Sequence, residues 1–291
     1  MPRIAAAPIS WGICDVPGWG HQLPAERVLR EMKELGIQAT EIGPAGFLPS
    51  DTSEARALLN KYGLGAVGTY LDLVLHDPAV AWEEELTRTV NFVRALGGDT
   101  IVLAVLAAPK SYDGSPGLNE QQWATLLKNL DRASDLAESN GITLAIHPHL
   151  GTLVCGPDEI GRVIRESKIG LCIDTGHTYV GGGDPTDFIK LAGDRLKVVH
   201  LKDVDKTLAD EVKRGSVDFL GAVDQGLFKP LGEGFLDVHG IFTALARTGF
   251  DGWIVLEQDV MLKYEPSETE GPVHSVQRSL ATAGEELAQV H

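Results

Sequence analysis

The sequence predicts an α/β protein that folds as one (β/α)8 barrel, a single domain spanning residues 1–291. Strand-like and helix-like segments alternate along the whole chain, and eight segments are short and almost continuously apolar, as in a parallel sheet covered by helices. The length accommodates eight such units without a linker or low-complexity stretch. An open doubly wound sheet is the alternative, but neither GxGxxG nor GxxxxGK[ST] occurs.

The predicted strands are apolar runs separated by turn-forming residues. They cover residues 3–9, 37–42, 64–71, 100–106, 142–147, 169–174, 196–201 and 253–257. The first strand ends before Ser10-Trp11-Gly12. The fourth is nearly all apolar, which indicates that both of its faces are buried.

The predicted helices follow the strands and carry start or stop signals. They cover residues 24–35, 52–62, 81–96, 119–139, 157–166, 184–192, 235–248 and 275–290. Gly36 and Gly63 terminate the first two helices. Asp184 is the expected N-cap of the sixth helix, with Pro185 at its first position.

Two connections are long for a compact domain: residues 107–118 after the fourth strand and residues 203–231 after the seventh. Both follow the C-terminal ends of strands, where barrel active sites form. Loops of this length are usually functional covers or interfaces, so we expect them beside the site.

The overall composition is that of an ordinary globular protein, with 43% hydrophobic residues and a net charge of −16. That charge argues against a nucleic-acid partner, which would need clustered Lys and Arg. The three cysteines are too few and too widely spaced for a disulfide framework, which favours a reducing compartment. Without a signal-like or membrane-spanning apolar run, we expect a cytoplasmic protein with no membrane partner.

Four successive strands end in a residue that can bind a metal ion. These residues are His147, Asp174, His200 and Glu257. Each has an ordinary structural alternative: a strand-end histidine is usually a packed rim residue, Asp174 could cap a helix, and Glu257 could form a surface ion pair. Because all four residues lie at the ends of successive strands, five to eight, their arrangement favours one site for a divalent ion. A mixed nitrogen and oxygen set suits manganese, cobalt, iron or zinc better than magnesium or calcium.

Several sequence segments together resemble one known family. They are Ala7-Pro8-Ile9-Ser10-Trp11-Gly12, Thr40-Glu41-Ile42-Gly43, His147-Pro148-His149-Leu150-Gly151-Thr152, Cys172-Ile173-Asp174-Thr175-Gly176-His177, His200-Leu201-Lys202-Asp203, Pro230-Leu231-Gly232-Glu233-Gly234 and Gly252-Trp253-Ile254-Val255-Leu256-Glu257-Gln258-Asp259. Over nearly its whole length the chain resembles the xylose isomerase-like TIM barrels (the sugar phosphate isomerase/epimerase group). Within that group it is most similar to inosose dehydratases, and the HPHxGT segment is the more specific marker.

The resemblance implies a divalent ion, usually manganese or cobalt, at the four strand ends, with zinc or iron as alternatives. It also implies a small polyol-ketone substrate. In the epimerases of the group, a glutamate on strand five pairs with the strand-eight glutamate across the substrate. Here the strand-five residue is His147, and a metal-bound imidazole is a poor base. That departure favours dehydration over epimerisation.

The expected chemistry is removal of the proton α to a ketone, followed by loss of the β-hydroxyl as water. Glu257 is the first choice of base, and Glu41 the second. Lys202 or His177 would supply a proton or hold substrate hydroxyls, although Lys202 could instead form an ion pair with Asp203 or Asp174.

Three further residues are expected at the substrate. Trp11 and Tyr70 would form an apolar wall, with rim packing as the alternative. His149 would contact substrate, yet it lies two residues from His147 and faces the same way, so it could be the ligand instead.

Other functions use the same barrel. The nearest is a metal-dependent keto-sugar isomerase or epimerase. An apurinic-site endonuclease is disfavoured by the acidic charge, and a sugar-binding barrel without chemistry is disfavoured by the intact set of four ligands. Barrels of this group often form homodimers or homotetramers, and either assembly is compatible with the sequence.

Overall fold

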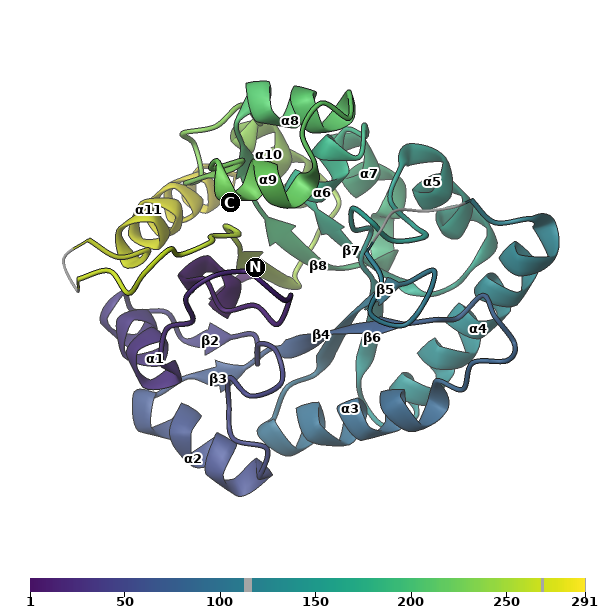
Figure 1. Ribbon diagram of the computed structural model, residues 1–291, viewed down its shortest axis with the longest axis horizontal. Coiled ribbons are helices and arrows are strands. Elements are labelled where there is room, and N and C mark those ends of the chain that lie inside the picture. Colours follow the sequence, from purple (N-terminus) through teal and green to yellow (C-terminus); the bar gives the residue numbers. More distant parts are fainter. Residues whose placement is uncertain (113–116, 268–269, 291) are drawn as a thin grey trace.

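The computed structural model describes residues 1–112, 117–267 and 270–290, and it shows a ring of helices around parallel strands (Figure 1). The strands of the main sheet are β1 (Arg3–Ala6), β2 (Ala39–Thr40), β3 (Gly65–Ala66), β4 (Gly68–Leu73), β5 (Thr100–Val105), β6 (Thr143–Ile146), β7 (Gly170–Asp174), β8 (Leu196–Leu201) and β11 (Trp253–Leu256). A short antiparallel pair, β9 (Asp203–Val204) and β10 (Phe228–Lys229), lies outside it.

The main sheet closes into a barrel at the segment predicted as the third strand, residues 64–71, which contains β3 and most of β4. Its strand order is β3-β2-β1-β11-β8-β7-β6-β5-β4, so β3 and β4 form the two ends. Only Val67 separates these two strands in the sequence, and β3 pairs with β2 while β4 pairs with β5. The segment 65–73 is therefore one barrel strand with an interruption. The predicted single-domain (β/α)8 barrel is confirmed.

The close approach of β4 to β5 explains why residue 68 is a glycine. A Cβ atom at Gly68 would lie 1.8 Å from the carbonyl oxygen of Thr100 in β5. Any larger residue would push β4 away from β5 at the point where the barrel closes.

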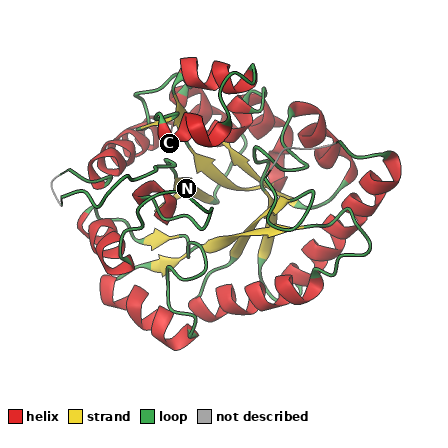
Figure 2. Cartoon of the chain, viewed as in Figure 1, coloured by secondary structure: helices red, strands yellow, loops and turns green. Residues whose placement is uncertain are grey.

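The helices surround the strands, as the red and yellow elements of Figure 2 show. They are α1 (Ala25–Glu34), α2 (Thr52–Tyr62), α3 (Glu83–Leu96), α4 (Glu120–Glu138), α5 (Pro157–Glu166), α6 (Thr175–Val180), α7 (Pro185–Ala192), α8 (Lys206–Lys213), α9 (Phe219–Asp224), α10 (Val238–Arg247) and α11 (Val273–Val290), with 3-10 turns at Pro8–Trp11 and Gly193–Arg195. Within the described residues, every helix is too short or too polar to span a lipid bilayer.

The predicted cap of α7 is confirmed. The Asp184 carboxylate accepts hydrogen bonds from the backbone N–H groups of Thr186 and Asp187, and Pro185 occupies the first helical position. Asn119 forms a reciprocal capping box with Gln122 at the start of α4. These caps fix where the helices begin, and thereby the lengths of the strand-to-helix loops.

The structure corrects the sequence-based prediction at several places. Helix α6 was not predicted, and the second strand is shorter than residues 37–42. The first strand ends at Ala6 rather than residue 9, because Pro8 begins a 3-10 turn. The connection 203–231, expected as a loop, contains α8, α9 and the β9–β10 pair. The other long connection, 107–118, has its residues 113–116 outside the described part of the chain.

Small side chains, contributed by each strand of the barrel, fill its interior. This buried layer contains Ala5, Ala7, Ala39, Val67, Val102, Ala145, Cys172, Val198 and Val255. We call it the inner layer. It closes the bottom of the barrel mouth in which the candidate site lies.

Candidate metal centre

The candidate ligands lie one level above the inner layer. Two positions beyond its residues 145, 172, 198 and 255 come His147, Asp174, His200 and Glu257. Because side chains alternate along a strand, residues two apart point into the same space, here the barrel interior. The strand register places these residues side by side. Asp174 of β7 pairs with His200 of β8, and His200 pairs with Val255 of β11, two residues before Glu257.

The four side chains bring their donor atoms together. His200 Nδ1 lies 3.2 Å from His147 Nε2, 3.2 Å from Glu257 Oε2 and 3.9 Å from Asp174 Oδ2. His147 Nε2 lies 3.6 Å from the same Asp174 oxygen. Ligands bound at about 2.1 Å lie roughly 3.0–3.4 Å apart around a divalent ion. The His147–His200 and His200–Glu257 distances fall in this range, and the two distances to Asp174 Oδ2, at 3.6 and 3.9 Å, are slightly longer. The four predicted residues are therefore candidate ligands of one divalent ion.

Two further groups of donors overlap this one. His147, Cys172 and His200 form one group with ligand atoms within 4.8 Å of one another, and Glu41, His200 and Glu257 form another. Cys172 belongs to the inner layer, where burial raises the pKa of its thiol. A protonated thiol is a weak ligand, so the carboxylates above it are better suited to hold an ion.

A buried lysine already places positive charge among these carboxylates. The Lys202 ammonium lies 2.7 Å from Asp174 Oδ2, contacts Glu257 Oε2, and lies 3.2 Å from Asp259 Oδ1. Asp203 is absent from this group, so of the two ion pairs considered from the sequence the one with Asp174 forms. The carboxylates of Asp174 and Glu257 thus share one cation, the Lys202 ammonium.

The charges of this cluster support one another. Burial opposes ionisation, but Lys202 holds the pKa of Asp174 well below its usual range, and His200 and Lys202 lower that of Glu257 to about 2. Burial likewise opposes the charge of Lys202, whose pKa the surrounding carboxylates hold well above its usual range. Both acids are therefore ionised and the lysine is protonated at neutral pH.

Asp259 is a site residue that the sequence reasoning did not single out. It is 5% exposed, and its second oxygen lies 4.0 Å from His177 Nε2. Burial raises its pKa to about 7; Lys202 opposes this rise, while Glu257 and Asp174 add to it. Its position two residues beyond Glu257, on the same face, was the available signal.

The structure distinguishes the two histidines of the HPH segment. His147 is the one whose Nε2 reaches His200 and Asp174. His149 lies one level higher: its Nδ1 is 2.7 Å from the carbonyl oxygen of Leu150, and its ring centre is 3.8 Å from that of His177, with the two rings tilted by 37°. His149 and His177 form the wall above the candidate ligands.

Aromatic side chains complete this wall. Tyr70 lies edge-on to His147 with ring centres 5.9 Å apart, and its hydroxyl is 2.9 Å from that of Tyr112. Phe219 of α9 lies 5.3 Å from the His177 ring. The long connection 203–231 therefore reaches the site, as the sequence led us to expect.

Trp11 is a correction to the sequence-based expectation. Its side chain is completely buried in the main core, and its indole N–H donates a 2.8 Å hydrogen bond to Glu31 of α1. Arg27 binds the other oxygen of Glu31 and also holds the carbonyl oxygens of Pro266 and Ser267. Packing and a buried polar network therefore account for Trp11, rather than contact with substrate.

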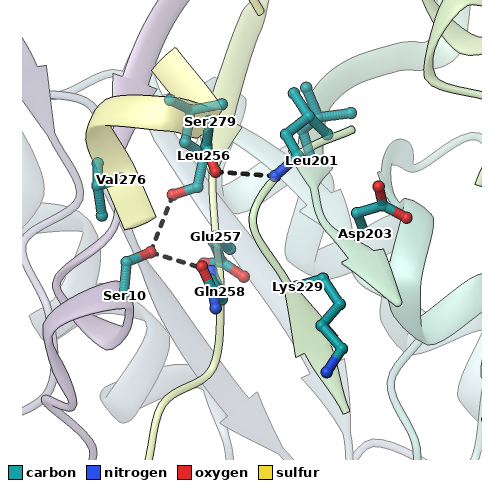
Figure 3. A pocket seen from close by; sticks show the side chains of 10 residues that line it. Ser10, Leu201, Asp203, Lys229, Leu256, Glu257, Gln258, Val276 and Ser279 are labelled. Atoms are coloured by element: carbon teal, nitrogen blue, oxygen red, sulfur yellow. Dashed lines mark hydrogen bonds between the residues drawn. The ribbon is translucent and has the colours of Figure 1, made fainter. Parts of the chain in front are cut away.

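A cavity of about 10 Å³ lies behind Glu257, between the site and α11 (Figure 3). Ser10, Gln258 and Ser279 contribute polar atoms to its lining. The Ser10 hydroxyl accepts a 3.0 Å hydrogen bond from the Gln258 backbone N–H. This bond holds the chain in place immediately after Glu257.

Comparison with known proteins shows which family the chain belongs to. The model of the xylose isomerase-like TIM barrel family matches residues 29–277. The chain belongs to this family. Within it, the chain is 32% identical to an inosose dehydratase of Geobacillus kaustophilus (strain HTA426) over 270 residues, covering 88% of this chain and 87% of that protein. The rhizopine catabolism protein MocC of Rhizobium meliloti is 31% identical, with coverages of 88% and 81%.

Solved structures share the fold of the family. L-ribulose 3-epimerase superimposes with a TM-score of 0.74 at 18% identity, covering 100% of this chain and 96% of that one. The IOLI protein with a bound zinc atom gives a TM-score of 0.72 at 15% identity, over 99% of both chains.

Proposed function

We propose that this protein is a metal-dependent dehydratase, a hydro-lyase that removes water from the cyclitol ketone inosose in inositol catabolism. The support from comparison is that relatives matched over most of their length carry the name inosose dehydratase. The support from the molecule is the donor cluster at the barrel mouth, beside a wall of imidazole and phenol groups that suits a hydroxyl-rich ring.

The observation that carries the proposal is the imidazole at position 147. Burial lowers the pKa of His147, so the ring is neutral and able to give its Nε2 lone pair to a metal. An epimerase needs a base on each face of the substrate, and here the carboxylate of Glu257 serves one side only. One-sided proton removal followed by loss of a leaving group fits this arrangement.

His147, Asp174, His200 and Glu257 would hold the ion, with manganese or cobalt as the proposed metals and zinc or iron as alternatives. A divalent ion bound there would polarise the ketone oxygen as a Lewis acid and so acidify the neighbouring C–H bond. That help matters because a carboxylate with a pKa of about 2 is a weak base on its own.

Each residue of the site has a separate role in the proposed elimination of water. Glu257 takes the proton from the carbon next to the ketone, and the C–H electron pair forms an enolate. The enolate expels the hydroxyl of the next carbon, which leaves as water with a proton from Lys202. His177 would hold a substrate hydroxyl instead, because burial keeps the pKa of its ring well below the usual range and the ring is neutral. The remaining enol tautomerises to a cyclic 1,2-dione. Tyr70, His149 and His177 line the space that the ring would occupy.

Turnover of inosose tests the proposal. We expect purified protein loaded with Mn²⁺ or Co²⁺ to convert inosose to a product with dione absorbance. A chelator should abolish the activity and added metal should restore it. Proton NMR in deuterated water separates loss of water from epimerisation, which only exchanges a C–H. Absence of a dione signal with every one of these metals would refute the dehydratase assignment.

The two histidines of the HPH segment give a paired prediction about the metal. His147→Ala should lower metal affinity by about 100-fold or more, because it removes a donor from the cluster. His149→Ala should keep the affinity within a few-fold and raise KM. Titration with Co²⁺, followed by its visible absorption, measures the affinity. Equal losses in both variants would contradict the assignment of His147 as the ligand.

A further inference from the structure

Glu41 lies behind His200 rather than facing the space above the cluster. It follows β2, two residues beyond Ala39 of the inner layer, and is only 6% exposed. Its Oε1 atom lies 3.0 Å from His200 Nε2, while the opposite nitrogen of the same ring, Nδ1, faces the other candidate ligands. The imidazole therefore stands between Glu41 and the candidate metal position.

The chemistry of imidazole assigns the two nitrogens different tasks. A neutral ring that gives the Nδ1 lone pair to a metal must carry its proton on Nε2. Left without an acceptor, that buried N–H would lose its hydrogen bond and destabilise the tautomer that binds metal. Glu41 Oε1 is the acceptor within hydrogen-bonding distance.

We propose that Glu41 is a positioning residue that fixes the tautomer and ring plane of His200 for metal binding, and not a base that acts on substrate. The inference rests on the metal centre of the proposed function. It replaces the second-choice catalytic role that the sequence suggested for Glu41. A carboxylate behind a metal-bound histidine also makes the ring a stronger ligand, and its loss typically weakens metal affinity 10- to 100-fold.

Glu41 also belongs to a group of three potential donors with His200 and Glu257. Direct ligation by Glu41 would require the ion on the Nε2 side of the ring. Three donors, His147, Asp174 and Glu257, lie on the Nδ1 side, so the ion is favoured there.

Co²⁺ binding to Glu41→Ala, Glu41→Gln and His200→Ala tests the proposal, with Glu34→Gln as the control at an exposed carboxylate of α1. We expect Glu41→Ala to lose 10- to 100-fold in Co²⁺ affinity and to change the visible spectrum of the bound ion. Glu41→Gln keeps a carbonyl acceptor for the Nε2 proton and should lose less. Circular dichroism confirms folding, and Glu41→Gln carries the test if the alanine variant fails to fold.

Three results would overturn the assignment. Wild-type affinity and spectrum in Glu41→Ala or Glu41→Gln, with turnover lost, would make Glu41 a base. Loss of affinity as complete as in His200→Ala would make it a ligand. Wild-type protein that takes up no Co²⁺ would refute the metal centre as well. Metal uptake without any turnover of inosose would refute only the dehydratase assignment, because the binding measurements stand without activity.

Discussion

Glu257→Gln is expected to reduce kcat by about 1,000-fold at saturating metal, because the amide cannot accept the α-proton. The substitution preserves the shape of the side chain and one carbonyl oxygen. The contact with His200 Nδ1, at 3.2 Å in the native protein, can therefore be kept in part. We expect the metal affinity to fall by only about tenfold, as for a weakened ligand. Single-turnover kinetics with inosose, in parallel with Co²⁺ titration, separates the two effects.

The opposite result is equally informative. A Glu257→Gln protein that binds metal and retains near-normal turnover would exclude Glu257 as the base. Asp259 would then be the carboxyl group to test, because it holds the same lysine and faces His177. Glu34→Gln again serves as the matched control, since it removes an exposed carboxylate outside the site.

Most strands of the barrel could be predicted because they are nearly continuous apolar runs. Residues 196–201 were predicted as the seventh strand, and β8 covers the same span. The errors come from local rules that compete with apolarity. Pro8 starts a 3-10 turn inside the run that begins at Arg3. The short helices α8 and α9 were missed although Asp205 and Asp218 cap them, because the apolar pattern of a short helix is brief.

The candidate ligands could be predicted because strand period and strand order together determine where a strand end points. His147, Asp174, His200 and Glu257 required no knowledge of side-chain contacts. The positions that failed or were missed depend on such contacts. Trp11 faces Glu31 rather than the mouth of the barrel, and a sequence does not say which side of a turn a ring takes.

Asp203→Ala is expected to destabilise the protein by about 4 kcal/mol and to lower Tm by about 10 °C. The Asp203 carboxylate is 1% exposed and is an acceptor for several backbone N–H groups at once. Oδ1 accepts from Val204 at 2.8 Å and Leu236 at 3.0 Å, and Oδ2 accepts from Gly232 at 2.9 Å and Gly234 at 3.0 Å. Alanine would leave these four N–H groups without their acceptor, and that of Val204 is fully buried.

The control is Asp205→Ala two residues away. Asp205 also accepts backbone hydrogen bonds, from Thr207 and Leu208 at the start of α8, but it is one-third exposed, and water can replace it. Loss of this cap should cost about 1 kcal/mol. Chemical denaturation of both variants measures the difference. If Asp203→Ala were no more destabilised than Asp205→Ala, the three hydrogen bonds to Gly232, Gly234 and Leu236 would not hold the 232–236 segment in place. Asp203 and Leu231 line the cavity behind Glu257, so loosening of the chain there should also lower turnover. Asp203→Asn keeps one oxygen acceptor, so its stability should lie between those of the wild-type protein and Asp203→Ala.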